Sequence, residues 1–126
     1  MTHHLSFATA NLPRAAAFYD ATLATLGHRR VCASESFVGY GQIDDADFFS
    51  LKLRSDGVTI PGDGFHLAFA ASTRAAVDAF YQAALQHSGT DNGGCGLHPE
   101  YGDHYYAAFV LDPDGYWIEA VICGPS

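Results

Sequence analysis

Hydrophobic residues alternate with small or polar residues in two short segments, at about 3–9 and 64–70. In the stretch after each segment, apolar residues recur every three to four positions. Alternation is typical of a strand with one buried face, and the longer period is typical of an amphipathic helix. We therefore expect each half of the chain to open with a strand followed by a helix.

The ends of both helices are marked by residues that stop or start a helix. Asn11 is suited to cap the first helix, and Ser72 or Thr73 is suited to cap the second. Gly27 and Gly89 stand where each helix would close in the left-handed conformation. The two helices are thus predicted to begin and end at matching places.

Shorter strand-like runs follow each helix. They lie at about 29–33, 36–41 and 47–54 in the first half, and at about 89–92, 104–111 and 116–122 in the second. Asp112-Pro113-Asp114-Gly115 predicts a tight turn between the last two runs. We interpret the glycine-rich segments 56–64 and 91–102 as a linker and a surface loop. Each half then has the order βαβββ.

The two halves are also related in sequence. When the chain is shifted by 62 residues so that His4 falls on His66, 10 of the 24 positions from 4 to 27 are identical, with no gap. The predicted fold class is therefore α+β, with two tandem βαβββ modules at about 1–56 and 63–126. A length of 126 residues suits a single domain, 1–126, built from both modules.

Composition and charge narrow the range of partners. The formal net charge is −8, from 14 acidic and 6 basic residues, so a nucleic acid or an anionic membrane would be repelled. Three widely spaced cysteines and no visible targeting or membrane-spanning segment indicate a cytoplasmic protein with reduced thiols. We expect a small-molecule substrate or ligand, with no nucleic-acid or membrane partner.

The two opening strands each direct a histidine to the same face as small residues. On this face lie two matching sets, His4, Ser6 and Ala8 in the first strand and His66, Ala68 and Ala70 in the second. Small side chains beside a polar one leave space, which a ligand cavity needs and a packed core avoids. The alternative is that both histidines are structural residues held by hydrogen bonds.

A carboxylate, Glu119, lies inside the otherwise apolar last strand, on the same face as Trp117. Burying a carboxylate without a partner is costly, and a metal ion shared with two imidazoles would offset that cost. His4, His66 and Glu119 would suit Zn²⁺, Mn²⁺, Fe²⁺ or Ni²⁺, and three protein ligands leave coordination positions open for substrate. An exposed or ion-paired Glu119 is the alternative.

No catalytic residue is identified by this pattern, but several side chains could contact a substrate. His104 enters a strand together with Tyr105 and Tyr106 and could reach the mouth of the pocket, and all three are candidate substrate-binding residues. Trp117, near Glu119, is the fourth candidate substrate-binding residue.

These segments resemble the vicinal-oxygen-chelate superfamily, which includes glyoxalase I, fosfomycin-resistance transferases, bleomycin-resistance proteins and extradiol dioxygenases. The similarity is carried by the segments 4–7, 11–12, 18–19 and 26–27 in the first half, and by 64–69 and 112–119 in the second. The resemblance implies mixed sheets that curl into a cup around a metal, often within a dimer. It also implies that His4, His66 and Glu119 are the metal ligands.

The sequence departs from glyoxalase I at one place. That enzyme has a fourth ligand, a glutamate, on the last strand of its first module, whereas the segment 48–53 here has no carboxylate. The resemblance thus implies a homodimeric metalloenzyme in which one divalent ion (Zn, Mn, Ni or Fe) chelates neighbouring oxygens of a small substrate. Its reaction class stays open among lyase, isomerase, transferase and ring-cleaving dioxygenase. The alternative is a metal-free protein of the bleomycin-resistance kind that sequesters a cationic aromatic ligand.

Overall fold

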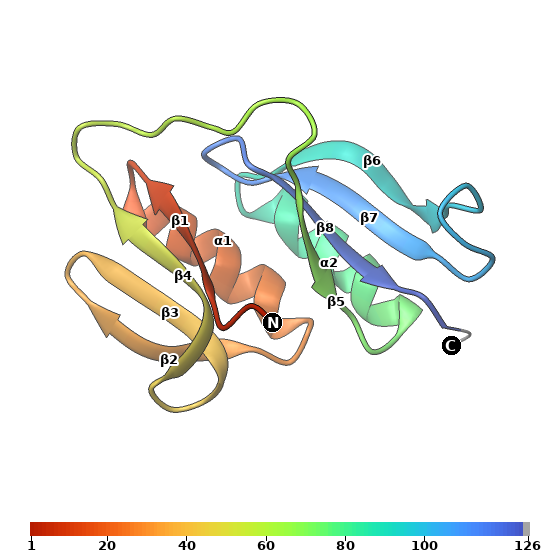
Figure 1. Cartoon of the computed structure of the whole chain (residues 1–126), viewed down its shortest axis with the longest axis horizontal. Helices are drawn as coiled ribbons and strands as arrows, with labels where there is room; N and C mark the ends of the chain where they lie inside the picture. The colour runs from red at the N-terminus through yellow and green to blue at the C-terminus, as the bar shows by residue number, and fades with distance from the viewer. Residues whose placement is uncertain (125–126) are drawn as a thin grey trace.

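The computed structural model describes residues 1–124 and contains two βαβββ modules in succession (Figure 1). The first module consists of β1 (Leu5–Thr9), α1 (Leu12–Ala24), β2 (Arg29–Ser34), β3 (Phe37–Ile43) and β4 (Ala46–Leu53). The second consists of β5 (Leu67–Ala70), α2 (Arg74–Gln86), β6 (Thr90–Leu97), β7 (Tyr106–Leu111) and β8 (Trp117–Ile122). The predicted α+β fold class is confirmed.

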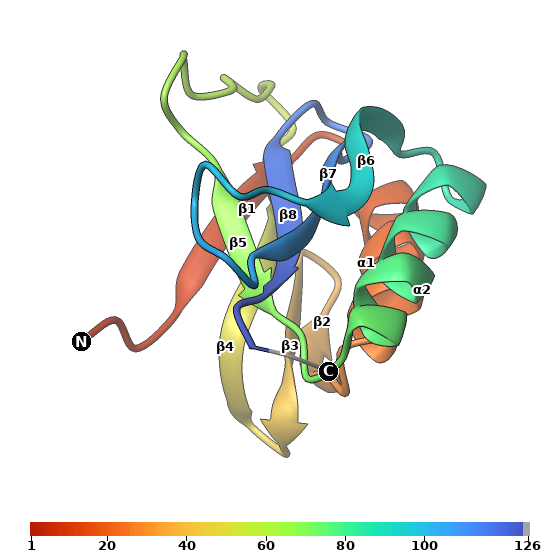
Figure 2. The ribbon, with the colours of Figure 1, turned by 90° about the vertical axis from the view of Figure 1, so that its right-hand side faces the viewer.

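Each module forms its own four-stranded mixed sheet with the same topology. The strand orders are β1-β4-β3-β2 and β5-β8-β7-β6. In both sheets the opening strand pairs in parallel with the last strand, and the other pairs are antiparallel. The two sheets stay separate within one chain, so the expected cup is not closed. The helices lie together on one side of the strands (Figure 2), and we call the opposite side of each sheet its free face.

Both predicted helix starts are confirmed by capping hydrogen bonds. The Asn11 side chain accepts from the backbone N–H of Arg14 at 3.1 Å, and the Thr73 hydroxyl accepts from that of Ala76 at 3.0 Å. Each bond satisfies one of the backbone donors that a helix leaves unpaired in its first turn.

The two helices end differently, although their sequences are related. Gly27 has the expected left-handed conformation, with φ of 89°. The same expectation for Gly89 is wrong, because Ser88 is the residue with positive φ, at 73°. Gly89 is instead required by close approach, since a Cβ there would lie 2.6 Å from the carbonyl oxygen of Ala84.

Part of the predicted loop 91–102 is in fact strand β6. The Asp91 carboxylate accepts from the backbone N–H groups of Gly93 and Gly94 at 3.1 and 2.8 Å, and the register with β7 shifts between Asp91 and Gly94. A glycine-rich bulge of this kind interrupts the alternation by which a strand is recognised.

Buried contacts between the modules fix their relative placement. The Tyr19 hydroxyl of α1 donates to Asp112, just after β7, at 2.6 Å. The Tyr116 hydroxyl donates to the carbonyl of Ala8 at 2.9 Å, and its ring stacks on Phe7 at 3.9 Å between centroids. Helices α1 and α2 also pack against each other. Among residues 1–124, no helix is both long and apolar enough to cross a membrane.

Candidate functional site

On the free face of the second sheet, the polar side chains of Glu119 and His66 lie next to each other. Ile118 and Ala120 of β8 belong to the buried core on the helix side. Glu119, between them, therefore points to the free face, because successive strand residues alternate. His66 directly precedes β5, which pairs in parallel with β8, so its side chain lies beside Glu119.

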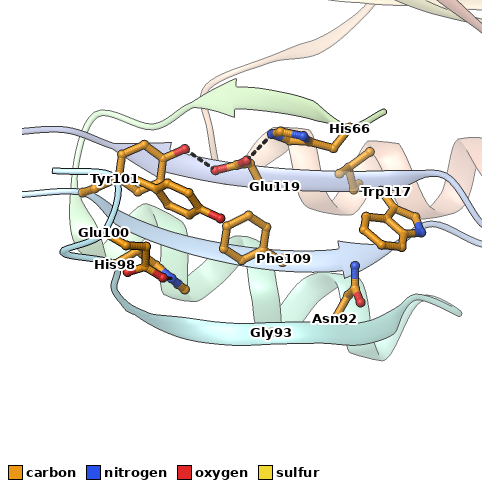
Figure 3. A pocket seen from close by; sticks show the side chains of 11 residues that line it. His66, Asn92, Gly93, His98, Glu100, Tyr101, Phe109, Trp117 and Glu119 are labelled. Carbon is orange, nitrogen blue, oxygen red and sulfur yellow. Dashed lines mark hydrogen bonds and ion pairs between the residues drawn. The ribbon is translucent and has the colours of Figure 1, made fainter. Parts of the chain in front are cut away.

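The two oxygens of the Glu119 carboxylate have different partners (Figure 3). Oε1 lies 2.8 Å from Nε2 of His66, and Oε2 accepts a 2.8 Å hydrogen bond from the Tyr105 hydroxyl. The Glu119 residue is 1% exposed, whereas the His66 side chain is 51% exposed. Both oxygens of the buried carboxylate thus have a polar partner, and one of these partners, His66, is open to solvent.

Tyr105 stays a hydrogen-bond donor at physiological pH. Burial, the bond to Glu119 and the charge of that carboxylate together raise the pKa of Tyr105 above its usual range. Its backbone carbonyl accepts from the N–H of His98 at 2.8 Å, which closes the base of the loop at 98–105. The position of the Glu119 carboxylate is therefore linked to this loop.

A pocket of about 510 Å³ opens in front of this pair. Its aromatic walls are Tyr101, Tyr105, Phe109 and Trp117. Its polar side chains are His66, Asn92, His98, Glu100 and Glu119. In Figure 3 the loop residues Glu100 and Tyr101 lie at one end, Trp117 lies at the other, and Phe109 lies between them.

The structure brings some predicted substrate-binding residues to this pocket and not others. Tyr105 and Trp117 line it, but Tyr106 and His104 do not. Tyr106 points to the helix side, because it follows Tyr105 in an extended segment, and its hydroxyl donates to Asp78 of α2 at 2.6 Å. That bond raises the pKa of Tyr106 to about 12. Its contact is thus with the protein itself.

Sequence reasoning missed several pocket residues. Phe109 could have been found from the hairpin turn at 112–115, because its register partner across β7 and β8 is Glu119. His98, Glu100 and Tyr101 lie in a loop without periodicity, so no sequence signal directs them to the site.

His4 lies apart from this pocket. It lines a different cavity of about 240 Å³, between the start of β1 and the strands β4 and β5, and its Nδ1 is 2.8 Å from Nδ1 of His3. Within residues 1–124 of one chain, no group of three His, Cys, Asp or Glu side chains is placed to hold a metal. The three-ligand set therefore stays a prediction.

His66 and Glu119 nevertheless fit a divalent metal as a pair of ligands. An imidazole nitrogen and a carboxylate oxygen converge at 2.8 Å at the wall of an open pocket, and both are donor types that Zn²⁺, Mn²⁺, Fe²⁺ and Ni²⁺ accept. Since residues 1–124 of the same chain place no third ligand beside this pair, a third protein ligand would have to come from elsewhere, such as a second subunit.

The internal repeat identifies the residue of the first module that is equivalent to Glu119. Ala68 is the register partner of Glu119, and its counterpart Ser6 is the register partner of Ser50. Ser50 thus occupies the position in β4 that Glu119 occupies in β8. It is 1% exposed, and its hydroxyl is hydrogen-bonded to that of Ser6 at 2.7 Å. The first module offers a serine pair where the second has a carboxylate.

A family model described as Glyoxalase/Bleomycin resistance protein/Dioxygenase superfamily matches residues 2–120. The chain belongs to this superfamily. The resemblance drawn from the sequence segments is thereby confirmed, and the two-module topology is shared with solved members. No curated protein matches the chain.

Solved structures of the superfamily are similar over nearly the whole chain. A glyoxalase/bleomycin resistance protein from Albidiferax ferrireducens T118 is 31% identical, with a TM-score of 0.81, covering 94% of this chain and 95% of that one. A glyoxalase/bleomycin resistance protein/dioxygenase family enzyme from Burkholderia phytofirmans PsJN is 19% identical, with a TM-score of 0.73 and coverage of 97% and 98%. A glyoxalase I mutant from Zea mays is 19% identical, with a TM-score of 0.70. It is matched over 94% of this chain but only 45% of its own length.

Proposed function

We propose that this superfamily member is a metal-dependent enzyme acting on a small molecule with two neighbouring oxygens. Its ion would be Zn²⁺, Mn²⁺, Ni²⁺ or Fe²⁺, held by His66 and Glu119 and completed by His4 of the partner subunit in a homodimer. The observation that carries the proposal is the buried Glu119 carboxylate, 2.8 Å from a half-exposed histidine at the wall of a pocket of about 510 Å³.

The partner is invoked because one chain leaves the site incomplete. His4 lines a cavity separate from the one that holds His66 and Glu119. Both sheets have free faces, and neither sheet closes on the other. If the free face of one chain's first sheet covered that of its partner's second sheet, two equivalent sites would form by two-fold symmetry.

When bound, the ion would polarise the two substrate oxygens and stabilise negative charge developing on them. The side chains of the pocket would perform the remaining tasks. Tyr105 holds Oε2 of Glu119, so that Oε1 alone faces His66. Phe109 and Trp117 offer apolar surface against which a substrate can be oriented and water excluded.

The segment 48–53 has no carboxylate to serve as a fourth metal ligand, and this bears on the reaction. In glyoxalase I, which this chain resembles in fold, a glutamate of the first module supports proton transfer. In this chain the β4 position equivalent to Glu119 is occupied by Ser50, which has no carboxylate. The isomerisation that glyoxalase I performs is therefore disfavoured. The identity of the metal would decide among other lyase or isomerase chemistry, group transfer and ring cleavage with O₂ at Fe²⁺.

The test is elemental mass spectrometry of untagged protein purified without chelators, before and after incubation with each ion. We expect about one ion per chain, lost in His66→Ala. His98→Ala is the matched control, because His98 lines the same pocket without contacting Glu119. Circular dichroism would verify that all three proteins are folded.

A metal-free outcome would favour the second candidate, a binding protein of the bleomycin-resistance kind. The observation in its favour is that the same pocket combines two glutamates with four aromatic rings. If no ion binds to wild type under any of these conditions, the enzyme proposal is overturned and this alternative takes its place.

A further inference from the structure

The permanently charged side chains that line the pocket are all negative. Its two carboxylates are Glu100 and Glu119, and no lysine or arginine is found among the side chains that line it within residues 1–124. The two lining histidines, His66 and His98, each lie near a pocket glutamate, at 2.8 and 3.5 Å. Any negative charge on a ligand beyond its chelating oxygens would therefore meet Glu100 and the rest of the pocket wall without a compensating lysine or arginine from the same chain.

The six basic residues of the chain are all used or placed elsewhere. Three form ion pairs with aspartates: Arg14 with Asp114, Arg29 with Asp44 and Arg30 with Asp20. Arg74 lies over the ring of Tyr106 on the helix side, and Lys52 and Arg54 belong to the first module. None of the six can neutralise an anionic ligand in this pocket within one chain.

The aromatic residues are arranged to receive a flat ligand. Phe109 lies at the centre of the pocket, next to Glu119, with Trp117 at one end and Tyr101 at the other (Figure 3). Rings placed in this way can stack on a planar group or contact it edge to face. Exposed faces of tyrosine and tryptophan also attract cations. Trp117 is 47% exposed and Tyr101 is 63% exposed.

We infer that the pocket selects a planar aromatic ligand that is neutral or positively charged, and that it discriminates against carboxylates and phosphonates. Such a ligand would lie over Phe109, direct its neighbouring oxygens to His66 and Glu119, and place a positive group towards Glu100. Glutathione adducts, which carry two carboxylates, would be poor ligands. The requirement for neighbouring oxygens rests on the proposed function, whereas the charge and ring preferences rest on the pocket walls alone.

Trp117 provides a direct readout, because it is the only tryptophan in the chain and lines the pocket. Its single indole N–H resonance can be followed by NMR while three catechols are titrated. The probes share one ring and one diol and differ in charge: dopamine is cationic, 4-methylcatechol is neutral and 3,4-dihydroxybenzoate is anionic. S-methylglutathione serves as a non-aromatic anionic probe.

We expect dopamine to bind about tenfold more tightly than 3,4-dihydroxybenzoate at low ionic strength, with 4-methylcatechol between them and S-methylglutathione weakest. Added salt should reduce the ratio between the affinities of dopamine and 3,4-dihydroxybenzoate. Glu100→Gln should narrow it by about threefold, because the Glu100 side chain is 60% exposed and partly screened. Asp103→Asn is the matched control, since it removes one negative charge from the same loop without lining the pocket.

Equal affinities for the three catechols, or tightest binding of the anion, would overturn the inference. If tight anion binding were abolished by Lys52→Gln, the cation would be Lys52 of the partner subunit, approaching from the free face of the first sheet. The titrations are run on protein stripped of metal by chelator and on protein reloaded with each ion. If metal leaves all affinities unchanged, the proposed function fails while the charge order still tests this inference.

Discussion

Glu119 is the residue at which stability and proposed chemistry meet. A buried carboxylate held by one histidine and one tyrosine carries the cost of its own desolvation, and the fold gains little from keeping it. Replacing Glu119 by Gln keeps the size and shape of the side chain. We therefore expect the metal-free variant to fold with a melting temperature no lower than that of wild type.

The same variant should lose metal affinity steeply. Its loss should exceed the roughly 10- to 100-fold that removal of an outer partner of a metal ligand costs. Titration with a competing chelator measures the affinity, and Glu100→Gln is the control, because it removes a carboxylate of the same pocket that does not contact His66. Unchanged metal affinity in Glu119→Gln would remove Glu119 from the ligand set.

Tyr105 should act on the metal through Glu119 without contacting it. Tyr105→Phe removes the donor to Oε2 and leaves the ring in place. The freed oxygen can then turn towards the ion, so the coordination should change along with an affinity loss of about tenfold. Cobalt-substituted protein reports both, because its visible absorption depends on coordination geometry. Tyr101→Phe, on the same loop, should leave the cobalt spectrum as in wild type.

At the scale of elements, the buried Tyr19 hydroxyl is one of the groups that anchor the β7–β8 turn to the first module. Tyr19 and Asp112 are 0% and 3% exposed, and their hydrogen bond is 2.6 Å long. Burial raises the pKa of the Asp112 carboxyl, and the bond from Tyr19 opposes that rise. Tyr19→Phe should lower the free energy of unfolding by about 1–3 kcal/mol, the cost of leaving a buried acceptor short of a donor.

Urea denaturation measures that loss, with Tyr81→Phe as the control. Tyr81 occupies the position equivalent to Tyr19 in the repeat, but its hydroxyl donates to the exposed Asp91. Its unfolding midpoint should stay near that of wild type. If both variants shifted equally, the tie between the modules would have no special role in stability.

The elements that sequence could predict are those in which local periodicity and tertiary packing agree. Both opening strands, both helix caps and the βαβββ order follow from alternation, capping residues and the repeat. The repeat was misleading where packing differs. The repeat predicts that Gly89 closes α2, but Ser88 takes the left-handed conformation, and Gly89 is a glycine because of the close approach of Ala84.

The candidate site was predictable only in part, for the same reason. Strand alternation predicts the face of its own strand on which His66 or Glu119 lies, and the cost of burying a carboxylate predicts that the two share a site. The structure brings them to 2.8 Å. The loop residues that complete the pocket, such as Glu100, depend on how a glycine-rich segment folds back, which no period encodes. The position of His4 relative to this pair depends on how modules meet, and alternation within a strand carries no information about that.

At the scale of the whole molecule, each metal site of the proposed dimer is shared between two chains. One chain contributes His66 and Glu119, and the other contributes His4. This arrangement can be tested by mixing two variants that are each expected to lack metal. In a heterodimer of His4→Ala with His66→Ala, one of the two sites would contain both substitutions and the other would contain neither. Each homodimer would instead have one ligand missing from both of its sites.

We therefore expect each variant alone to be depleted of metal and the mixed dimer, isolated with a different tag on each chain, to regain about one ion per two chains. The physical reason is that two-fold symmetry gives each site one contribution from each subunit. If His4 and His66 met within one chain, every site in the mixed dimer would lack a ligand and no metal would return. Sedimentation of the wild type provides the preceding check, because a monomer with a full complement of metal would exclude a shared site altogether.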